Sequence, residues 1–465
     1  TDNVAIGEAA LDAVTTGSDN TAVGDNAGGG ITTGSQNVAV GSASGLALTT
    51  GDQNVIVGDQ AGEGLTTASA NTLVGGESGG GATVTGDHNV GVGRKTLFDN
   101  TSGTKNVAVG RSALENNTTG ASNIGIGYQA LMATTTADGN VAVGEGAGAA
   151  NTTGTENVFI GHEAGNDVTT GAGHVFVGWK AGDAVTTASQ SVAVGDQALS
   201  AASTGSHNTA VGYNAMLANT TGDENTAVGS TALDANTTGT QLTALGKGAL
   251  SANTTANANT ALGHQSMISN TTGASNTAVG KEALKANTTA TENVAVGATA
   301  GDALTTGSEN VVIGSDALST STTGGNNVAI GRMALRVSTA AGNTAVGHQS
   351  MIANTTGAAN VAVGKNSLDE NTTGDTNTAI GYDALEGNTT GSNNTAVGGD
   401  ALKSNTTAGN NTAIGKSALT ANTTGASNVA AGLEALKTNT TGASNIAIGV
   451  GALENNTTAS YNVAI

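Results

Sequence analysis

The chain has 465 residues, of which 72 are glycine and 2% are aromatic, and it contains neither proline nor cysteine. So few large side chains exclude a thick globular core, and the lack of cysteine excludes disulfides and thiolate chemistry. A formal net charge of −21 disfavours nucleic-acid binding, which needs clustered basic residues. No apolar run approaches the ~18 residues of a membrane-spanning helix, so we expect no membrane insertion.

One 17-residue unit repeats along the chain. With Asn as position 1 it reads N-[VT]-A-[VI]-G-x-x-A-L-x-x-N-T-T-G-x-x, and it starts 28 times. The spacing slips twice, by one extra residue after Asn71 and by one fewer after Asn327. Such tandem repetition predicts a single array over residues 1–465 with no separate globular domain. The units are more variable in 1–205 and more regular in 206–465.

The first five positions of the unit have the composition of a strand. Positions 2 to 4 are β-branched, then small, then β-branched, and position 5 is glycine in all 27 units that reach it. Such a glycine indicates a positive φ or a very close backbone approach. The absence of proline suits a structure in which every backbone N–H is a donor. We therefore predict an all-β, parallel β-solenoid of about 27 coils, stacked at the ~4.8 Å spacing of strands.

Positions 8 to 12 carry one large apolar side chain that changes place between units. Most units have Leu at position 9 and Asn at position 12, as in Leu233 and Asn236. Six units have Gly at position 9 and an aliphatic residue at position 12: Gly28 with Ile31, Gly45 with Leu48, Gly62 with Leu65, Gly165 with Val168, Gly182 with Val185, and Gly301 with Leu304. Because residues three apart face opposite sides of a flat strand, this exchange predicts a bent, half-buried segment. Gly148 followed by Asn151 breaks the exchange.

The last five positions predict a second short strand or a corner at 13–15, followed by a turn. Position 15 is Gly or Ala, so it requires a small residue more than an unusual dihedral angle. Stacked coils would align Asn at positions 1 and 12, and the threonines at 13 and 14, into ladders of hydrogen bonds. The Asn-Thr-Thr triplets also match the N-glycosylation sequon. We favour a ladder over glycosylation for these asparagines, which include Asn117, Asn151, Asn219, Asn236, Asn253 and Asn270.

The strand positions are apolar on both faces. We assign positions 2 and 4 to the core, which leaves position 3 pointing outward. Position 3 is never polar, and strands that are apolar on both sides are buried on both sides. We therefore expect position 3 to be covered by a second copy of the chain. The predicted residues of this lateral interface are Ala22, Ile56, Leu73, Phe159, Phe176, Ala227 and Val312.

The chain offers like groups repeated everywhere, whereas catalysis needs unlike groups converging at one place. We expect no enzyme activity, no cofactor and no metal site, and we interpret the six histidines as surface-turn residues. Trp179, near Phe176 and Phe159, is the one aromatic cluster in the sequence. We favour inter-chain packing for this cluster, with a local ligand platform as the alternative.

The words "NVAIG" (Asn3–Gly7) and "NTAIGYDALEGNTTG" (Asn377–Gly391) carry a family resemblance. They resemble the head repeats of trimeric autotransporter adhesins and the N-T-A-I-G-x-x-A-L-x-x-N-T-T-G repeats of phage tail-fibre proteins. The resemblance implies a trimeric, left-handed β-roll in an extracellular fibre, whether a secreted filament, a cell-surface fibre or a virion fibre. It also implies a cell-surface or glycan receptor as a partner beside the chain itself.

Two functions are compatible with these patterns. The first is a structural or adhesive extracellular fibre that associates laterally, as a homotrimer or filament, and stacks end to end. The second is a surface-binding module in which threonine and asparagine ladders, such as the one containing Thr237 and Thr238, bind ice or glycans. The chain starts and stops within a repeat, so we expect either a longer parent chain or end-to-end stacking.

Overall fold

The computed structural model describes residues 2–201 and 204–465, which form two units, Thr1–Thr238 and Gly239–Ile465. Each unit is a parallel β-solenoid with coils of about 17 residues, and the two units together contain about 27 turns. No helix occurs in the described part of the chain. The prediction of an all-β tandem-repeat solenoid is confirmed.

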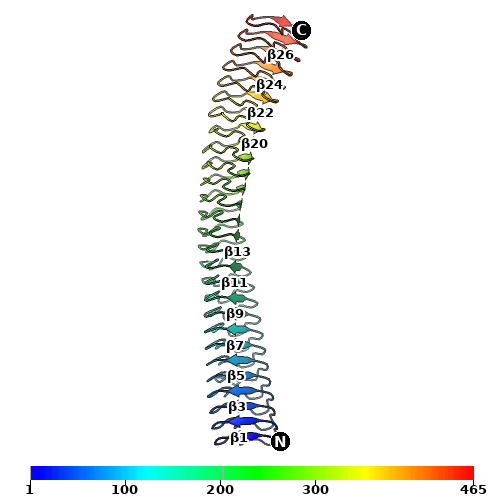
Figure 1. Ribbon diagram of the computed structural model, residues 1–465. Helices are drawn as coiled ribbons and strands as arrows, with labels where there is room; N and C mark the ends of the chain where they lie inside the picture. The colour runs from blue at the N-terminus through cyan, green and yellow to red at the C-terminus, as the bar shows by residue number, and fades with distance from the viewer. Residues whose placement is uncertain (1, 202–203) are drawn as a thin grey trace. The chain divides into compact units, whose positions relative to one another are not determined.

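Each coil contributes one strand at positions 2 to 4, because the β-branched residues there favour an extended backbone. The strands of Thr1–Thr238 are β1 (Val4–Ile6), β2 (Thr21–Val23), β3 (Val38–Val40), β4 (Val55–Val57), β5 (Thr72–Val74), β6 (Val90–Val92), β7 (Val107–Val109), β8 (Ile124–Ile126), β9 (Val141–Val143), β10 (Val158–Ile160), β11 (Val175–Val177), β12 (Val192–Val194), β13 (Thr209–Val211) and β14 (Thr226–Val228). Those of Gly239–Ile465 are β15 (Thr243–Leu245), β16 (Thr260–Leu262), β17 (Thr277–Val279), β18 (Val294–Val296), β19 (Val311–Ile313), β20 (Val328–Ile330), β21 (Thr344–Val346), β22 (Val361–Val363), β23 (Thr378–Ile380), β24 (Thr395–Val397), β25 (Thr412–Ile414), β26 (Val429–Ala431), β27 (Ile446–Ile448) and β28 (Val463–Ala464). Within each unit the strands stack in chain order (Figure 1).

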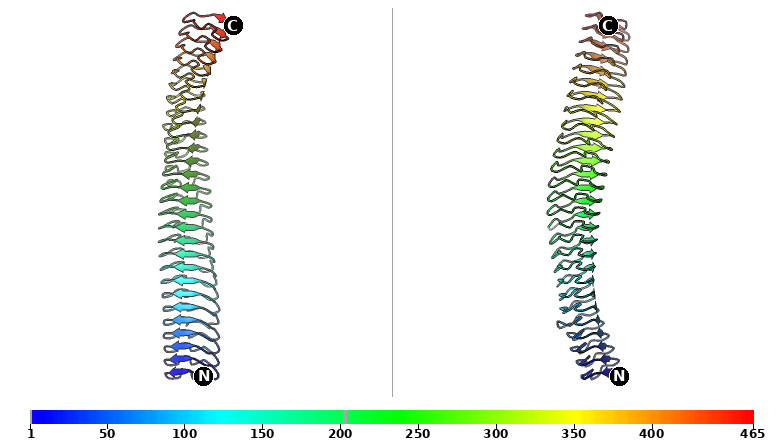
Figure 2. Two further views of the ribbon diagram at one scale, coloured as in Figure 1. Left: turned by 45° about the vertical axis from the view of Figure 1, so that its right-hand side comes forward. Right: turned by 60° about the vertical axis from the view of Figure 1, so that its left-hand side comes forward.

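Within each unit, consecutive strands pair in parallel, so that like positions of neighbouring coils lie side by side. The register survives both slips in spacing, because Thr72 pairs with Val90 and Val328 pairs with Thr344. The extra and the missing residue are therefore absorbed by the loops. Two further views show the strands aligned as one column along the stack in each unit, with loops joining successive strands (Figure 2).

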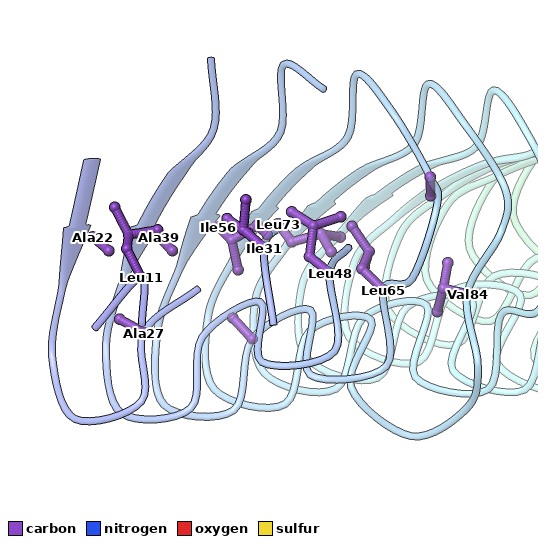
Figure 3. Packing of buried hydrophobic residues seen from close by; sticks show 12 residues of the cluster. Leu11, Ala22, Ala27, Ile31, Ala39, Leu48, Ile56, Leu65, Leu73 and Val84 are labelled. Atoms are coloured by element: carbon purple, nitrogen blue, oxygen red, sulfur yellow. The ribbon is translucent and has the colours of Figure 1, made fainter. Parts of the chain in front are cut away.

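The core of each coil is formed by positions 3, 8 and 9, or by position 12 where position 9 is glycine. Ala22 and Ala27 are fully buried, and Ile31 is 1% exposed. A close view of the first coils shows these side chains gathered inside the coil (Figure 3). Position 3 therefore points inward, and our assignment of the two strand faces was reversed. The coil is too narrow for two β-branched residues per strand inside, so alanine faces the interior and the larger side chains face outward.

The invariant glycine at position 5 has both predicted features, a positive φ and a close approach to a neighbouring backbone. Gly263 has a φ of +142°, and a Cβ added there would collide with the backbone carbonyl of Gly280 in the next coil. The glycine at position 15 differs, because Gly273 and its equivalents in the solenoid do not adopt a positive φ. Alanine occupies position 15 in other coils, as Ala290 does, so that position needs a small residue rather than a left-handed backbone.

The bent segment explains the exchange between positions 9 and 12. Leucine at position 9 has a left-handed backbone, with a φ of +52° at Leu97, which costs roughly 1–2 kcal/mol for a residue with a side chain. Glycine at position 9 removes this cost, and the aliphatic residue at position 12 then fills the space. A Cβ added at Gly28 would lie 3.0 Å from Cδ1 of Ile31. Positions 13 and 14 form a bend rather than a regular second strand, and one isolated bridge, Leu65 with Val84, lies outside the named strands of the described residues.

Candidate interaction surfaces

The outer face of the strands carries an aliphatic column at position 4 and, at position 2, a column that is valine or isoleucine in most coils and threonine in eleven. Positions 2 and 4 point away from the core, and position 4 is Val, Ile or Leu in every coil except the one with Ala431. In β18, Val294 is 38% exposed and Val296 is 37% exposed, whereas Ala295 between them is fully buried. Pleated strands turn alternate side chains to opposite faces, so in-register stacking aligns these residues from coil to coil. We call this surface, positions 2 and 4 of the stacked strands, the outer strand face.

The predicted lateral-interface residues lie elsewhere. Each is at position 3, in the interior of its own coil, and is at most 2% exposed: Ala22, Ile56, Leu73, Phe159, Phe176, Ala227 and Val312. None of them is accessible to a second chain, so their assignment to a lateral contact was wrong. Alanine fits the narrow interior, and the larger residues occur where neighbouring glycines make room. Ile56, for example, packs where a Cβ at Gly45 or Gly62 would lie.

The asparagines at position 12 form a buried ladder. Asn117 donates from Nδ2 to Oδ1 of Asn100 in the preceding coil at 2.9 Å, and to the carbonyl of Gly120 in its own coil at 3.0 Å. The predicted asparagines are all fully buried: Asn117, Asn151, Asn219, Asn236, Asn253 and Asn270. An N-glycan attaches to the side-chain amide nitrogen, and that nitrogen is an enclosed hydrogen-bond donor here. The folded coil therefore leaves no room for glycosylation at these residues.

A second buried ladder runs along position 1 and closes each coil. Nδ2 of Asn37 donates to the carbonyl of Gly51 at the end of the same coil at 2.9 Å. Its Nδ2 and its backbone N–H also donate to Oδ1 of Asn20 in the preceding coil, at 3.1 and 3.0 Å. The carboxamide of Asn37 thus closes its own coil and joins it to the preceding one.

His174 replaces asparagine in this position 1 ladder, so interpreting it as a surface-turn residue was wrong. Its Nε2 lies 2.8 Å from the carbonyl of Ala188, and its Nδ1 accepts from the backbone N–H of Ser191 at 3.3 Å. This pattern requires a neutral imidazole with the proton on Nε2. Burial lowers the pKa of His174, which favours the same neutral form.

The two threonine columns differ in exposure. The hydroxyl at position 13 donates to the backbone carbonyl of the next coil, as Thr118 does to Thr135 at 3.0 Å. The threonine at position 14 is exposed, as Thr119 is. In this coil Thr118 is half-buried and Thr119 is exposed, whereas both threonines are exposed in other coils, as at Thr355 and Thr356. The ice-binding alternative stays a prediction.

The aromatic cluster is divided between inside and outside. Phe159 and Phe176 pack against each other within the core, with ring centroids 5.8 Å apart and ring planes tilted by 40°. Trp179, at position 6 of its coil, points to solvent and is 45% exposed. Tyr128, Tyr213 and Tyr382 are also exposed at position 6, a column that sequence reasoning missed because it treated this position only as a variable turn. Aligning the coils by position would have revealed it.

Charged groups gather at the bend of the coils near Lys403. Its Nζ lies 2.5 Å from Asp383, 3.0 Å from Glu386 and 3.4 Å from Asp400, and these contacts raise the pKa of the lysine. Burial and the neighbouring carboxylates raise the pKa of Asp369 to about 6. Among the described residues no group of three or more His, Asp or Glu side chains has an arrangement that could hold a metal ion. The single lysine offsets part of the negative charge of these carboxylates.

No family model matches the chain, and a search of curated proteins finds no relative with significant similarity. In the described residues no helix is long and apolar enough to cross a membrane.

Proposed function

We propose that the chain is a structural fibre protein whose solenoid units associate laterally with other copies through the outer strand face. The aliphatic column at position 4, joined by valine or isoleucine at position 2 in most coils, carries this proposal. Soluble monomers rarely expose a contiguous apolar patch larger than a few hundred Å², and larger patches are typical of interaction sites. A standard interface buries roughly 800 Å² per partner, which ten coils supply if each contributes about 80 Å². Each unit has fourteen strands along this face.

The strand ladder also supports growth along the axis of a solenoid. An exposed coil end presents unpaired backbone donors and acceptors, which another coil can pair with. Stacking of copies end to end would continue the parallel pairing seen between all consecutive coils described within a unit. In such a fibre, strand pairing between copies extends the length, and contacts through the outer strand face increase the width.

The resemblance to adhesin heads and tail fibres supports the finer parts of the proposal. It favours three copies arranged as left-handed rolls, an extracellular location and a role in adhesion to a cell surface. The acidic balance of the sequence, 35 acidic against 14 basic residues, favours solubility of a chain with so many alanines and glycines. We propose a structural and adhesive role rather than a catalytic one.

Replacing outward valines tests the lateral contact. In a Val294→Lys, Val296→Lys double variant, two charges stand on the outer strand face while the core residue Ala295 is unchanged. We expect the mass measured by sedimentation equilibrium, a multiple of 44.4 kDa in the wild type, to fall because lateral association is lost. The matched control is Thr289→Lys, at the exposed position 14 of the preceding coil, which should keep the wild-type mass. A wild-type protein that sediments as a single chain at all concentrations would contradict the proposal.

A further inference from the structure

Six consecutive coils of Thr1–Thr238 carry an unusual set of residues at position 6. In chain order they are Tyr128, Glu145, His162, Trp179, Asp196 and Tyr213, and all six are exposed. The whole sequence has only eight aromatic residues, and three of them stand in this row. An exposed indole or phenol ring leaves apolar surface in water, so three such rings in one line indicate a surface that contacts a ligand.

The row is continuous because like positions of stacked coils lie side by side. Neighbouring side chains in the column reach each other, since the guanidinium carbon of Arg111 lies 5.9 Å from the ring centroid of Tyr128 in the next coil. Nζ of Lys180 lies 5.2 Å from the ring centroid of Trp179 and 3.2 Å from a carboxylate oxygen of Glu163. The ion pair holds the lysine beside the indole, and this contact restricts the orientation of the ring.

We propose that this row, which we call the aromatic row, binds an extended chain of a neutral polysaccharide. A pyranose ring has a face of C–H groups, which pack on aromatic rings, and a rim of hydroxyls. Tyr128, Trp179 and Tyr213 supply flat apolar faces, two to three coils apart. Glu145 and Asp196 lie between them and accept hydrogen bonds from hydroxyls.

The spacing and charge of the row define the ligand class. Neighbouring coils are ~4.8 Å apart, a length comparable to one pyranose ring, so an extended polysaccharide that lies along the row can contact successive coils. The unit Thr1–Thr238 contains 5 basic and 22 acidic residues. This charge repels a polyanion, which excludes acidic polysaccharides and favours neutral ones.

Affinity electrophoresis and intrinsic fluorescence test the proposal. The probes are mixed-linkage β-glucan, galactomannan and dextran, with alginate as the anionic comparison. Because Trp179 is the single tryptophan of the chain, its emission reports directly on the row. We expect at least one neutral polysaccharide to retard the protein and to shift the emission, and alginate to do neither.

Substitutions locate the binding surface. Trp179→Ala and Tyr213→Ala should each weaken binding about three- to tenfold, the typical contribution of one aromatic contact. Tyr382→Ala is the matched control, because Tyr382 is 53% exposed at the same position but in a coil of Gly239–Ile465 outside the row. It should bind as the wild type does, and circular dichroism should show that all three variants are folded.

The proposal is overturned if none of the neutral polysaccharides binds, if alginate binds better than they do, or if Trp179→Ala binds like the wild type. It is also overturned if Trp179→Ala changes only the mass of the assembly, because the row is then a contact between copies. The Val294→Lys, Val296→Lys variant separates the two proposals, since it should lose lateral association and keep polysaccharide binding.

Discussion

The ring of Phe159 occupies the space in which a side chain at Gly165 would lie. A Cβ added at Gly165 would overlap ring atoms of Phe159 in the same coil, and one added at Gly148, in the preceding coil, would lie 2.6 Å from ring atom Cδ2. The ring therefore fills the leucine site of two successive coils. This explains why Gly148 is followed by Asn151 rather than by an aliphatic residue: the missing volume comes from the next coil.

This relationship predicts a strong coupling between the two positions. Phe159→Ala should destabilise the protein by about 3–5 kcal/mol, because it empties a buried aromatic site. Gly165→Ala should cost more in the wild type than in the Phe159→Ala background, where only the roughly 1–2 kcal/mol of a left-handed backbone remains. A double-mutant cycle from urea denaturation measures the difference. Equal costs in the two backgrounds would show that the ring and the glycine do not compete for space.

The compensation between large residues at position 3 and glycine at position 9 shows what could and could not be predicted from the sequence. The unit length, the strand at positions 2 to 4, the special glycine at position 5 and the exchange between positions 9 and 12 follow from residue types that allow few alternatives. Which face of the strand points into the core could not be predicted in this way, because Val-Ala-Val is apolar on both faces. The missing signal was internal: the large residues Ile56, Leu73 and Phe176 occur in coils with glycine at position 9. If a large side chain at position 3 occurs where position 9 has no side chain, the two positions must fill the same core.

The candidate surfaces were predictable only in part for a related reason. Composition predicted ladders of asparagine, and Asn117 is in such a ladder. Trp179 was grouped with Phe159 and Phe176 because they are near in sequence. In the structure position 3 lies inside the coil, whereas position 6 lies on its surface. Repeat position, rather than sequence distance, decides which residues share a surface in a solenoid.

The two glycine columns predict opposite responses to one methyl group. Gly263→Ala should destabilise the protein by more than ~3 kcal/mol, because the new Cβ meets both a positive φ and the carbonyl of Gly280. Gly273→Ala should cost less than ~1 kcal/mol, although an ideal Cβ there would lie 2.2 Å from the carbonyl oxygen of Ala290, because φ at Gly273 is not positive and the alanines at this position in other coils show that a small backbone shift relieves the contact. Thermal unfolding of the two variants measures the difference. A similar melting temperature for both would show that position 5 is not special.

The position 12 ladder makes Asn270 a structural residue rather than a glycan acceptor. Its Nδ2 donates to Oδ1 of Asn253 at 3.0 Å and to the carbonyl of Gly273 at 2.9 Å. Expression in a glycosylating host should therefore yield an unmodified Asn270 by mass spectrometry of the folded protein. Asn270→Asp replaces the donor by an acceptor and should cost about 2–5 kcal/mol in denaturant unfolding. A glycan found at Asn270 of the folded protein would refute the buried ladder.

His174 predicts a loss of stability in mild acid. Burial holds its pKa below the ordinary value of about 6.5, so the folded state disfavours the protonated form. Its contribution to stability is complete above pH ~6.5 and is lost as the pH falls through the lower pKa of the folded state. His174→Asn restores the common residue and should flatten this part of the stability profile, measured by urea denaturation between pH 7.5 and 5. The exposed His264→Asn is the control, and an unchanged profile in His174→Asn would contradict the assignment.

Cysteine cross-linking tests the central claim, which is that positions 2 and 4 face other copies while position 3 is enclosed. The chain has no cysteine of its own, so Val296→Cys and Ala295→Cys each introduce a single thiol, at neighbouring positions of β18. With a short bis-maleimide, Val296→Cys should form covalent multimers, whereas Ala295→Cys should stay unreactive until the protein is unfolded. A reactive thiol at position 295, or a freely labelled Val296→Cys that never cross-links, would contradict the account.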